Sequence, residues 1–308
     1  MAQFQQHRLP TTKQLRYFVA LAEQKHFGRA AAQCFVSQSA FSTAIQELET
    51  LLEVQLVDRT NRRVAVTATG NEIAVLARLC LQDLNTLAET ARSHSKPLQG
   101  TLRLGVIPTI APFLLPTVLP LLRTEFPQLK LLLHEDVTES IRAQLADGQL
   151  DAGLLALPYN LPGLEQMKLF RDRFRLAARK GTKLVDPENY TYSRLHSGSV
   201  LLLREGHCLR EHAIDACKIR DSQKLTEFSA SSLLTLIEMV DADLAITFLP
   251  EMAVGSSLLQ HTKIETYPLK DSNYREIGLV WRRGSARGKE FRTLGKSIRE
   301  HYRNSVEQ

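Results

Sequence analysis

The spacing of apolar residues changes near Gly100, and this change constrains the fold more than any other feature of the chain. Before Gly100, apolar residues recur at steps of three and four, which is the period of amphipathic helices. After it, short apolar runs alternate with helical segments in a βαβ rhythm, which indicates a mainly parallel sheet with covered faces. The sequence therefore predicts a helical N-terminal part followed by an α/β part.

The helical part begins with three short predicted helices, over residues 12–24, 28–34 and from Ser37 to about Leu52. Ser37 is a residue type suited to the N-cap of the third helix. The stretch from Val64 to Thr67 alternates like a short strand and would form a β-wing. A tight turn before a third helix, followed by a wing, matches a winged helix-turn-helix, so residues 1–67 are predicted to be a DNA-binding domain.

A longer amphipathic helix is predicted from about Thr69 to Ser93. It leaves a small domain with an apolar stripe that needs a partner surface, and pairing with the same helix of a second chain would supply one. We therefore assign residues 68–99 to a dimerisation helix and a hinge. Cys34 and Cys80 lie on apolar faces of predicted helices, and we interpret both as packing residues.

The α/β part is long enough for two lobes with a cleft between them. Helices are predicted at 112–124, 137–147 and 287–302, and strands at 101–107, 130–134, 150–157, 173–178, 199–203, 244–248 and 277–281. We assign residues 100–308 to a two-lobed domain of the periplasmic-binding-protein type. Lobe I would comprise about 100–171 and 268–308, and lobe II about 172–267.

The termini and the charge bear on where such a chain works. The first residues have no apolar core of a secretory signal, and the stretch from Ile110 to Leu122 is too short to cross a bilayer. We expect a cytoplasmic protein without a membrane partner. The formal net charge of +6 is a weak indication of a polyanionic partner.

Several polar side chains of the predicted helix-turn-helix could contact DNA. Gln can bond adenine with two hydrogen bonds, Ser and Thr can bond bases or phosphates, and wing arginines can neutralise phosphates. The candidates are Ser37, Gln38, Ser39, Ser42 and Thr43 in the third helix and Arg59, Arg62 and Arg63 in the wing. The alternative is a three-helix packing module with a solvated arginine cluster.

A second group of candidate residues surrounds Cys208. Nearby cations stabilise a reactive thiolate, and His207 and Arg210 flank Cys208. Cys217 follows nine residues later and is available to resolve a sulfenic acid. In a straight helix these residues would be about 13.5 Å apart along the axis, whereas a disulfide needs Cα atoms roughly 4.4–6.8 Å apart. If the reduced segment is helical, a bond between them requires it to be remodelled.

Two structural interpretations of the same residues remain open. Cys208 and Cys217 could be buried packing residues, or His207, Cys208, His212 and Cys217 could bind a metal, although their spacing matches no common zinc motif. Four cysteines are too few for a disulfide scaffold, and in a reducing cytosol they are free, metal-bound or redox-active.

The N-terminal part closely resembles the LysR type of bacterial transcriptional regulator. The resemblance runs from Leu15 to Gly70 and includes Leu15-Arg16-Tyr17-Phe18, Ala30-Ala31-Ala32, Val36-Ser37-Gln38-Ser39-Ala40, Leu48-Glu49, Leu56-Val57-Asp58-Arg59-Thr60 and Thr67-Ala68-Thr69-Gly70. It implies dimers formed through the helix that follows and a two-lobed effector domain. Ser39 stands where proline is common, and Glu53 where glycine is usual. The third helix also lacks the arginine that the family often places there, so the operator sequence is open.

The rest of the chain resembles the peroxide-responsive OxyR branch of that family. The matching residues are Gly206-His207-Cys208-Leu209-Arg210 with Cys217, Gly105-Val106-Ile107-Pro108-Thr109, Leu114-Leu115-Pro116, His134-Glu135 with Thr138, Ala245-Ile246-Thr247-Phe248-Leu249-Pro250, and Tyr274-Arg275 before Trp281-Arg282. This resemblance implies that Cys208 attacks hydrogen peroxide and that Cys217 closes a reversible disulfide. Glu211 stands where the branch often has aspartate.

Supporting roles follow from the same resemblance. Thr109 and Thr138 would hold peroxide or a water near the thiol, and Arg275 would be a basic residue near the sensing site, with His207, Arg210 and Glu211 beside it. Each has a structural alternative. Thr109 could end a strand, and Thr138 could begin a helix capped by Asp136 and Glu139. Arg275 could form a surface ion pair, and Arg210 could be an ordinary ion-pair partner.

The expected function is a homodimeric or homotetrameric transcriptional activator of oxidative-stress defence genes, without metal or cofactor and not an enzyme. Its expected partners are promoter DNA, RNA polymerase, hydrogen peroxide and a reductant of the glutaredoxin or thioredoxin kind. One alternative is a LysR-type regulator with inert cysteines that binds a small-molecule effector between the lobes. Another is a thiol peroxidase or a metalloprotein.

Overall fold

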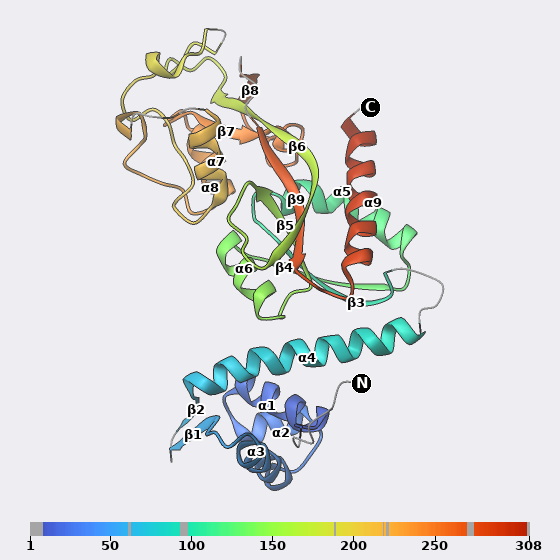
Figure 1. The fold of residues 1–308 in the computed structure, drawn as a ribbon. Coiled ribbons are helices and arrows are strands. Elements are labelled where there is room, and N and C mark those ends of the chain that lie inside the picture. The colour runs from blue at the N-terminus through green and yellow to red at the C-terminus, as the bar shows by residue number, and fades with distance from the viewer. Residues whose placement is uncertain are drawn as a thin grey trace. The chain divides into compact units, whose positions relative to one another are not determined.

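A computed structural model describes residues 9–60, 63–92, 98–187, 189–217, 219, 222–269 and 274–306 (Figure 1). Contacts divide the chain into two compact units. The first comprises Met1–His94 with Asp147–Gln149, and the second comprises Ser95–Ala146 with Leu150–Gln308.

Three helices form the core of the first unit: α1 (Thr12–Gln24), α2 (Phe27–Gln33) and α3 (Gln38–Leu52). The predicted cap of α3 is confirmed, because the Ser37 side chain accepts a hydrogen bond from the Ala40 N–H at 3.3 Å. Glu53 ends α3 with a φ of 54°. That left-handed conformation favours glycine, which explains why glycine is usual at this position in the family.

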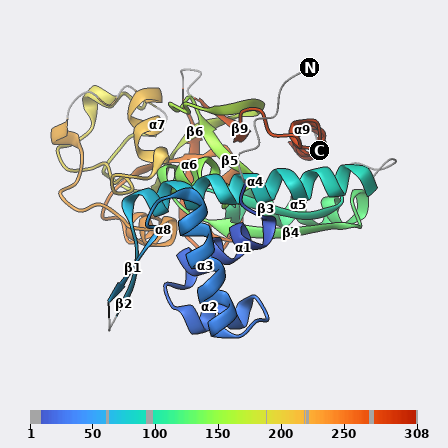
Figure 2. The same ribbon diagram turned by 60° about the horizontal axis from the view of Figure 1, so that its bottom comes forward.

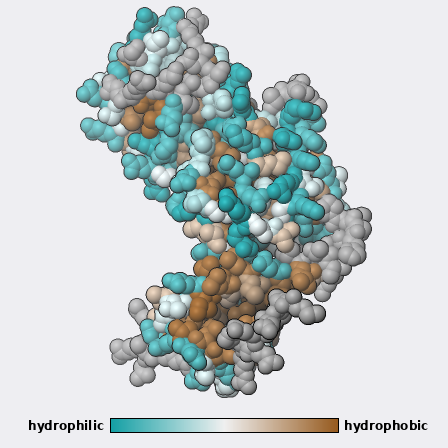
Figure 3. Space-filling view, viewed as in Figure 1, coloured by the Kyte–Doolittle hydropathy of each residue, from teal (hydrophilic) through white to brown (hydrophobic). Residues whose placement is uncertain are grey.

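The wing is a hairpin of two antiparallel strands, β1 (Val57–Thr60) and β2 (Arg63–Val66), which stands beside α3 in Figure 2. The sequence predicted only the second strand. The predicted long helix is confirmed as α4 (Ala68–Arg92). Its side chains include Leu76, Leu84 and Leu87, all exposed, and an apolar surface accordingly lies over this unit in Figure 3. Cys34 packs partly against the helical core, whereas Cys80 is exposed in the single chain, so its expected packing role would have to be toward a second subunit.

The second unit is built on a sheet in the order β4-β3-β5-β9-β6-β7, with β8 also paired to β6. Its strands are β3 (Gly100–Val106), β4 (Leu129–Glu135), β5 (Ala152–Leu157), β6 (Leu164–Arg179), β7 (Thr247–Pro250), β8 (Ile264–Pro268) and β9 (Tyr274–Arg282). Among these strands of the described residues, only the pairs of β3 with β4 and with β5 are parallel. The pairs β5–β9, β6–β9, β6–β7 and β6–β8 are antiparallel. The prediction of a mainly parallel sheet is therefore wrong, because β9 returns from the distant C-terminal part to lie between β5 and β6.

The long strand β6 joins two lobes. Its first half pairs with β9 in the lobe that contains α5 (Ala111–Glu125), α6 (Thr138–Ala146) and α9 (Gly288–Val306). Its second half pairs with β7 and β8 in the lobe that contains α7 (Cys208–Ala216) and α8 (Leu233–Asp241). Each lobe has its own apolar core, as the predicted two-lobed architecture requires. Three short 3₁₀ turns, Tyr192–Arg194, Ser222–Lys224 and Glu251–Ala253, complete the second lobe.

Some elements differ from the sequence prediction. Residues 199–203 form only isolated bridges at Val200 and Leu203 rather than a strand. The strand predicted at 244–248 begins at Thr247, and α8, β8 and the first half of β6 were not predicted. Within the described residues, no helix combines the length and apolar character needed to cross a bilayer.

Candidate redox site

The two candidate cysteines lie at opposite ends of one short helix. Cys208 is the first residue of α7 and Cys217 is its C-cap, and both are free, buried thiols. Cys208 packs into the apolar core of the first lobe, whereas Cys217 packs into that of the second. Nine residues of helix separate Cα atoms by about 13.5 Å, far beyond the roughly 4.4–6.8 Å that a disulfide allows. The two sulfurs therefore cannot bond while α7 is intact.

The surroundings of Cys208 are assembled from the beginnings of helices. Thr109 follows β3 and precedes α5 by two residues, and Thr138 is the first residue of α6, which follows β4. Because β3 and β4 are adjacent and parallel, their carboxyl ends lie side by side, and so do the residues that follow them. Cys208 at the start of α7 completes the group, and helix N-termini favour a negative charge such as a thiolate.

Opposing influences act on the Cys208 thiol. Burial, the largest influence, raises the pKa of Cys208 above its ordinary value, and the carboxylate of Glu211 raises it further. The Thr138 and Thr109 hydroxyls and the Arg275 guanidinium lower the pKa. Because burial dominates, Cys208 is held mainly as the thiol, and the groups that favour its thiolate are already in place around it.

Arg275 is almost fully buried and is fixed on several sides. Its Nε donates to Asp172 Oδ2 at 3.0 Å, its Nη1 to Thr109 Oγ1 at 3.0 Å and its Nη2 to the Thr109 carbonyl at 2.8 Å. The surface ion pair considered from the sequence is therefore wrong, because neither Arg275 nor Asp172 is exposed at its side chain.

The residues next to Cys208 in sequence contribute less than their proximity suggests. Burial lowers the pKa of His207 below its ordinary 6.5, so this imidazole is neutral at pH 7. Arg210 turns its Nη1 to the Leu203 carbonyl at 3.3 Å and is not among the groups that shift the Cys208 pKa. Glu211 is exposed. The cation that acts on the Cys208 thiol is therefore Arg275, which lies on strand β9 rather than on α7.

Thr138 combines both interpretations considered from the sequence. It begins α6, and its buried hydroxyl makes no hydrogen bond of ordinary geometry with any described residue. Asp136 lies just before the helix and accepts from the Val137 N–H at 2.8 Å and from the Ser140 hydroxyl at 2.5 Å. The capping box with Glu139 does not form, because the Glu139 carboxylate pairs with Arg142 instead.

Cys217 has a different environment. Burial raises the pKa of Cys217 to about 12, and no cation is among the causes. Burial also raises the pKa of the nearby Tyr190, with Cys217 as a further cause. Cys217 is therefore a protonated, unreactive thiol while α7 is formed.

The middle of α7 is fastened to the first lobe. His212 Nε2 lies 3.2 Å from the Pro158 carbonyl oxygen. The next residue, Tyr159, directs its hydroxyl to Glu139 Oε2 at 3.5 Å, and burial, the largest cause, raises its pKa. From the sequence, Tyr159 was not identified as a site residue, and His212 was considered only as a possible metal ligand.

The metal-site alternative finds no support in the geometry. His207 and Cys208 lie at one end of α7, and Cys217 lies at the other. In the described parts of the chain, no group of three or more His, Cys, Asp or Glu side chains is arranged to hold a metal ion.

The candidate DNA-contacting side chains lie at the start of α3. Gln38, Ser39 and Thr43 are exposed and Ser42 is half-buried. The Ser37 and Ser39 hydroxyls lie 3.1 Å apart, and the Thr43 hydroxyl donates to the Ser39 carbonyl at 3.1 Å. Arg62 lies outside the described residues, and so do the side chains of Arg59 and Arg63.

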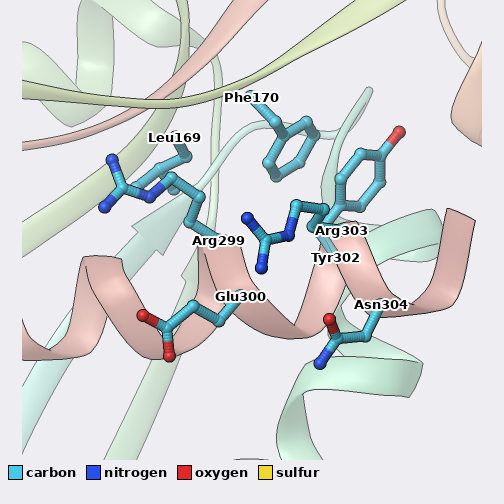
Figure 4. A pocket seen from close by; sticks show the side chains of 7 residues that line it. All are labelled: Leu169, Phe170, Arg299, Glu300, Tyr302, Arg303 and Asn304. Carbon is cyan, nitrogen blue, oxygen red and sulfur yellow. The ribbon is translucent and has the colours of Figure 1, made fainter. Parts of the chain in front are cut away.

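A separate cavity of about 560 Å³ opens beside α9 (Figure 4). The Phe170 and Tyr302 rings stack there with centroids 3.5 Å apart, and Arg299 and Arg303 project from the helix next to them. None of the residues around Cys208 lines this cavity. Tyr302 and Asp172 were missed by the sequence analysis, since neither has a local motif that identifies it.

Two family models match the chain. The model described as "Bacterial regulatory helix-turn-helix protein, lysR family" matches residues 12–71, and "LysR substrate binding domain" matches residues 95–303. Together they cover both units.

Individual relatives match along nearly the whole length. A "Probable hydrogen peroxide-inducible genes activator" from Streptomyces viridosporus is 38% identical, over 96% of each chain. The "HTH-type transcriptional regulator EstR" of Acinetobacter baylyi is 37% identical, over 92% of this chain and 94% of its own. Among solved structures, a full-length OxyR variant from Pseudomonas aeruginosa superposes with a TM-score of 0.80 at 32% identity, over 95% of this chain and 96% of that one.

Proposed function

Because this chain belongs to the LysR family of bacterial transcriptional regulators, we propose that it is a DNA-binding regulator of the OxyR type that responds to hydrogen peroxide. The proposal rests chiefly on one observation. The buried, reduced thiol of Cys208 is influenced by Thr109, Thr138 and Arg275, and the thiol of Cys217 lies at the far end of the same helix.

The chemistry proceeds in two steps. The Cys208 thiolate attacks one oxygen of peroxide, the O–O bond breaks, and sulfenic acid forms while the other oxygen leaves as water after taking up a proton. The Cys217 thiol then displaces the sulfenic hydroxyl as water and closes the disulfide. Overall, two thiols and one peroxide give one disulfide and two waters. A dithiol of the glutaredoxin or thioredoxin kind restores both thiols by exchange.

The site favours a small oxidant. Cys208 is 5% exposed, so a bulky electrophile has little access to it. Thr109 and Thr138 offer hydroxyls beside the sulfur, and Arg275 offers positive charge. These groups stabilise the thiolate and the negative charge that develops on the departing oxygen. His207, Arg210 and Glu211 would support the site from the start of α7.

The disulfide couples to shape through α7. Because the thiols cannot meet while this helix is formed, closure has to unwind it and to draw at least one sulfur out of its core. The two lobes then repack, and a homodimer or homotetramer presents its DNA-binding domains differently. The exposed apolar side chains of α4 suit the contact between subunits.

The output is activation of oxidative-stress defence genes in the cytoplasm. Ser37, Gln38, Ser39, Ser42 and Thr43 would contact promoter DNA, and Arg59, Arg62 and Arg63 would contact phosphates. The altered dimer would recruit RNA polymerase. The site consumes one peroxide per reduction cycle, so it acts as a sensor rather than as an enzyme.

A peroxide titration of the reduced protein tests the proposal. Thiol counting should show the loss of two thiols per chain at low peroxide, and mass spectrometry should find the Cys208–Cys217 crosslink. Cys208→Ser should abolish both the crosslink and promoter switching, whereas Cys80→Ser, at an exposed site on α4, should preserve them. Promoter switching that persists in Cys208→Ser would contradict the proposal.

A regulator that answers a small-molecule effector between the lobes is the second candidate. It is favoured by the relative EstR, which is as similar as the peroxide-inducible activators and whose name does not mention peroxide. This candidate requires thermal stabilisation by an organic ligand and promoter binding that does not change after peroxide treatment, whereas the peroxide sensor requires promoter switching that depends on Cys208.

A further inference from the structure

Asp172 is a buried carboxylate that binds Arg275 of the candidate peroxide site. Neither the sequence motifs nor the matched families assign it a role. We propose that Asp172 is a positioning residue that holds Arg275 against Thr109 and thereby sets the reactivity of Cys208. This inference rests on the function proposed above and identifies a residue that acts on Cys208 only through others.

Both oxygens of Asp172 are committed. Oδ2 accepts from Arg275 Nε at 3.0 Å, and Oδ1 accepts from the Met252 N–H at 3.1 Å. The side chain is completely buried. A carboxylate held from two directions in this way cannot rotate without leaving a donor unpaired, so it provides a fixed support.

The strand register, rather than a loop, sets the pair. Asp172 on β6 lies directly opposite Arg275 on β9 in the antiparallel ladder. Residues directly opposite in such a ladder have Cβ atoms about 4.5–5.5 Å apart, close enough for an acidic and a basic side chain to meet. Both strands run through the sheet that joins the lobes, and this gives the pair a rigid base.

Asp172 also determines which way the guanidinium faces. In the described structure, four of the five Arg275 N–H groups have acceptors: Asp172, the Thr109 hydroxyl, the Thr109 carbonyl and, at 3.6 Å, the Met252 sulfur. Because Nε is bound to Asp172, the edge with both Nη atoms faces Thr109. The remaining N–H is on Nη1, on the side of the Thr109 hydroxyl.

The orientation is passed on through Thr109. Its hydroxyl oxygen accepts from Arg275 Nη1, so its own proton is free to point elsewhere. The Thr109 hydroxyl lowers the pKa of Cys208, which places it as a donor toward the sulfur. Asp172, Arg275, Thr109 and Cys208 therefore form one ordered chain of contacts from β6 to the thiol at the start of α7.

Two roles for Asp172 give opposite results when its charge is removed. If Asp172 only neutralised Arg275, Asp172→Asn would strengthen the field of the guanidinium at the sulfur, lower the Cys208 pKa and speed its oxidation. If Asp172 positions Arg275, the same change releases the guanidinium from its place, raises the Cys208 pKa and slows oxidation. The sign of the change separates the two.

The experiment uses the full-length reduced protein and four forms: wild type, Asp172→Asn, Arg275→Gln and the double variant. Sulfenic acid at position 208 is followed after a peroxide pulse, and the Cys208 pKa is measured from the pH dependence of its alkylation by peptide mass spectrometry. We expect Asp172→Asn to slow the oxidation of Cys208 at least tenfold and by up to about a hundredfold, because a misplaced group costs a rate of this size. The Cys208 pKa should rise in the same variant. In the Arg275→Gln background, Asp172→Asn should change the rate by less than about twofold, because residues that act as a unit are not additive.

Glu251→Gln is the matched control. Glu251 is a neighbouring carboxylate that pairs with Arg175 at 3.3 Å and does not contact Arg275, so its loss should leave the oxidation rate within about twofold of wild type. If Asp172→Asn fails to fold, Asp172→Glu decides the question, because it keeps the charge but displaces it by one methylene: positioning predicts slower oxidation of Cys208, whereas neutralisation alone predicts an unchanged rate. Burial raises the pKa of Asp172, so a carboxyl left without Arg275 can take up a proton.

The inference is overturned if Asp172→Asn oxidises within twofold of wild type, if its Cys208 pKa falls, or if the double variant is much slower than Arg275→Gln alone. The alkylation measurement needs no peroxide chemistry. If wild type forms no sulfenic acid, the proposed function fails, and the effect of Asp172 on the Cys208 pKa still confirms or refutes its positioning role.

Discussion

The stability of α7 should control how fast the disulfide closes, and Asp215 offers a way to test this without disturbing the core. Asp215 is exposed in the last turn of α7. An acidic residue there opposes the helix dipole and has a low helix propensity. Asp215→Ala and Asp215→Gly remove the same charge and differ only in how well they support a helix.

The expected magnitude follows from helix propensity. Glycine is about 0.8–1.0 kcal/mol less favourable than alanine inside a helix. If α7 must unwind before the sulfurs meet, this difference appears in the closure rate as a factor of about four to five. It also shifts the equilibrium: because the reduced state is the one with the helix, the glycine variant should have a reduction potential about 20 mV more negative than the alanine variant.

The assay separates the two chemical steps. Reduced variants are mixed with peroxide, quenched in acid and analysed for sulfenic acid and for disulfide. Sulfenic acid should form at equal rates, because Asp215 lies at the far end of α7 and is not among the groups that shift the Cys208 pKa. Equal closure rates in the alanine and glycine variants would refute the requirement that α7 unwinds before closure.

Three further outcomes are expected. Burial raises the pKa of Cys217 to about 12, so the unfolded state loses the thiol proton before the folded state does as the pH rises. The free energy of unfolding should therefore fall by up to about 1.4 kcal/mol per pH unit from about pH 9 upward. Denaturant titrations should show a shallower fall in Cys217→Ala. Thr138→Val removes a buried hydroxyl that has no hydrogen-bond partner of ordinary geometry among the described residues, so melting should show about 1 kcal/mol of added stability. Stopped-flow oxidation of Cys208 should slow in the same variant. A variant that is more stable and is oxidised as fast as wild type would contradict the role of Thr138. Leu76→Asp places a charge on the exposed apolar face of α4, and sedimentation should show dissociation toward monomers, whereas an unchanged mass would remove this face from the subunit contact.

Local patterns were sufficient for the helical part of the chain. The Ser37 cap and the stripe of Phe41, Ile45 and Leu48 predict α3 because a helix is stabilised by neighbours three and four residues apart. The same period predicts α4 almost to its ends. The first wing strand was missed because its four residues have no clear alternation of their own and are paired only through the hairpin.

The pairing partner and the direction of a strand cannot be predicted from its local pattern. The apolar run at 277–281 identifies a strand but not its neighbours. It lies between β5 and β6, antiparallel to both, because the chain returns to the first lobe after completing the second. The 199–203 run is equally apolar and yet forms only isolated bridges, since its residues are buried in the second core without a continuous partner strand. Pairing between distant segments decides both cases.

The candidate site shows the same division. Cys208 and its short distance in sequence from Cys217 are evident in the sequence, and so are the flanking His207 and Arg210. Proximity in sequence suggested the wrong cations, because His207 is neutral and Arg210 turns to a backbone carbonyl. Arg275 was identified only through resemblance. Asp172 has no local signal, since its partner is 103 residues away and the arginines on either side give it the pattern of a surface residue.

The environments of the two thiols indicate where the rearrangement begins. Cys208 is held at the first lobe partly by groups that favour its thiolate, namely Thr109, Thr138 and Arg275. Conversion to sulfenic acid adds a polar oxygen to a sulfur that is packed in the first core, and the added atom crowds these groups. Cys217 has no such partner and is held by apolar packing, which oxidation of the other sulfur does not change. The start of α7 should therefore come loose first, while its end stays in the second core.

Hydrogen exchange on a trapped intermediate tests this order. In Cys217→Ala, peroxide should stop the reaction at the sulfenic acid, because no second thiol is available at the end of α7. Amides in the first turns, at His212 and Ala213, should then exchange faster than in the reduced variant, while the amide at position 217, bonded to the Ala213 carbonyl at 2.9 Å, should change less. The opposite gradient would mean that the second core releases the helix first, and that the oxygen added at Cys208 does not start the switch.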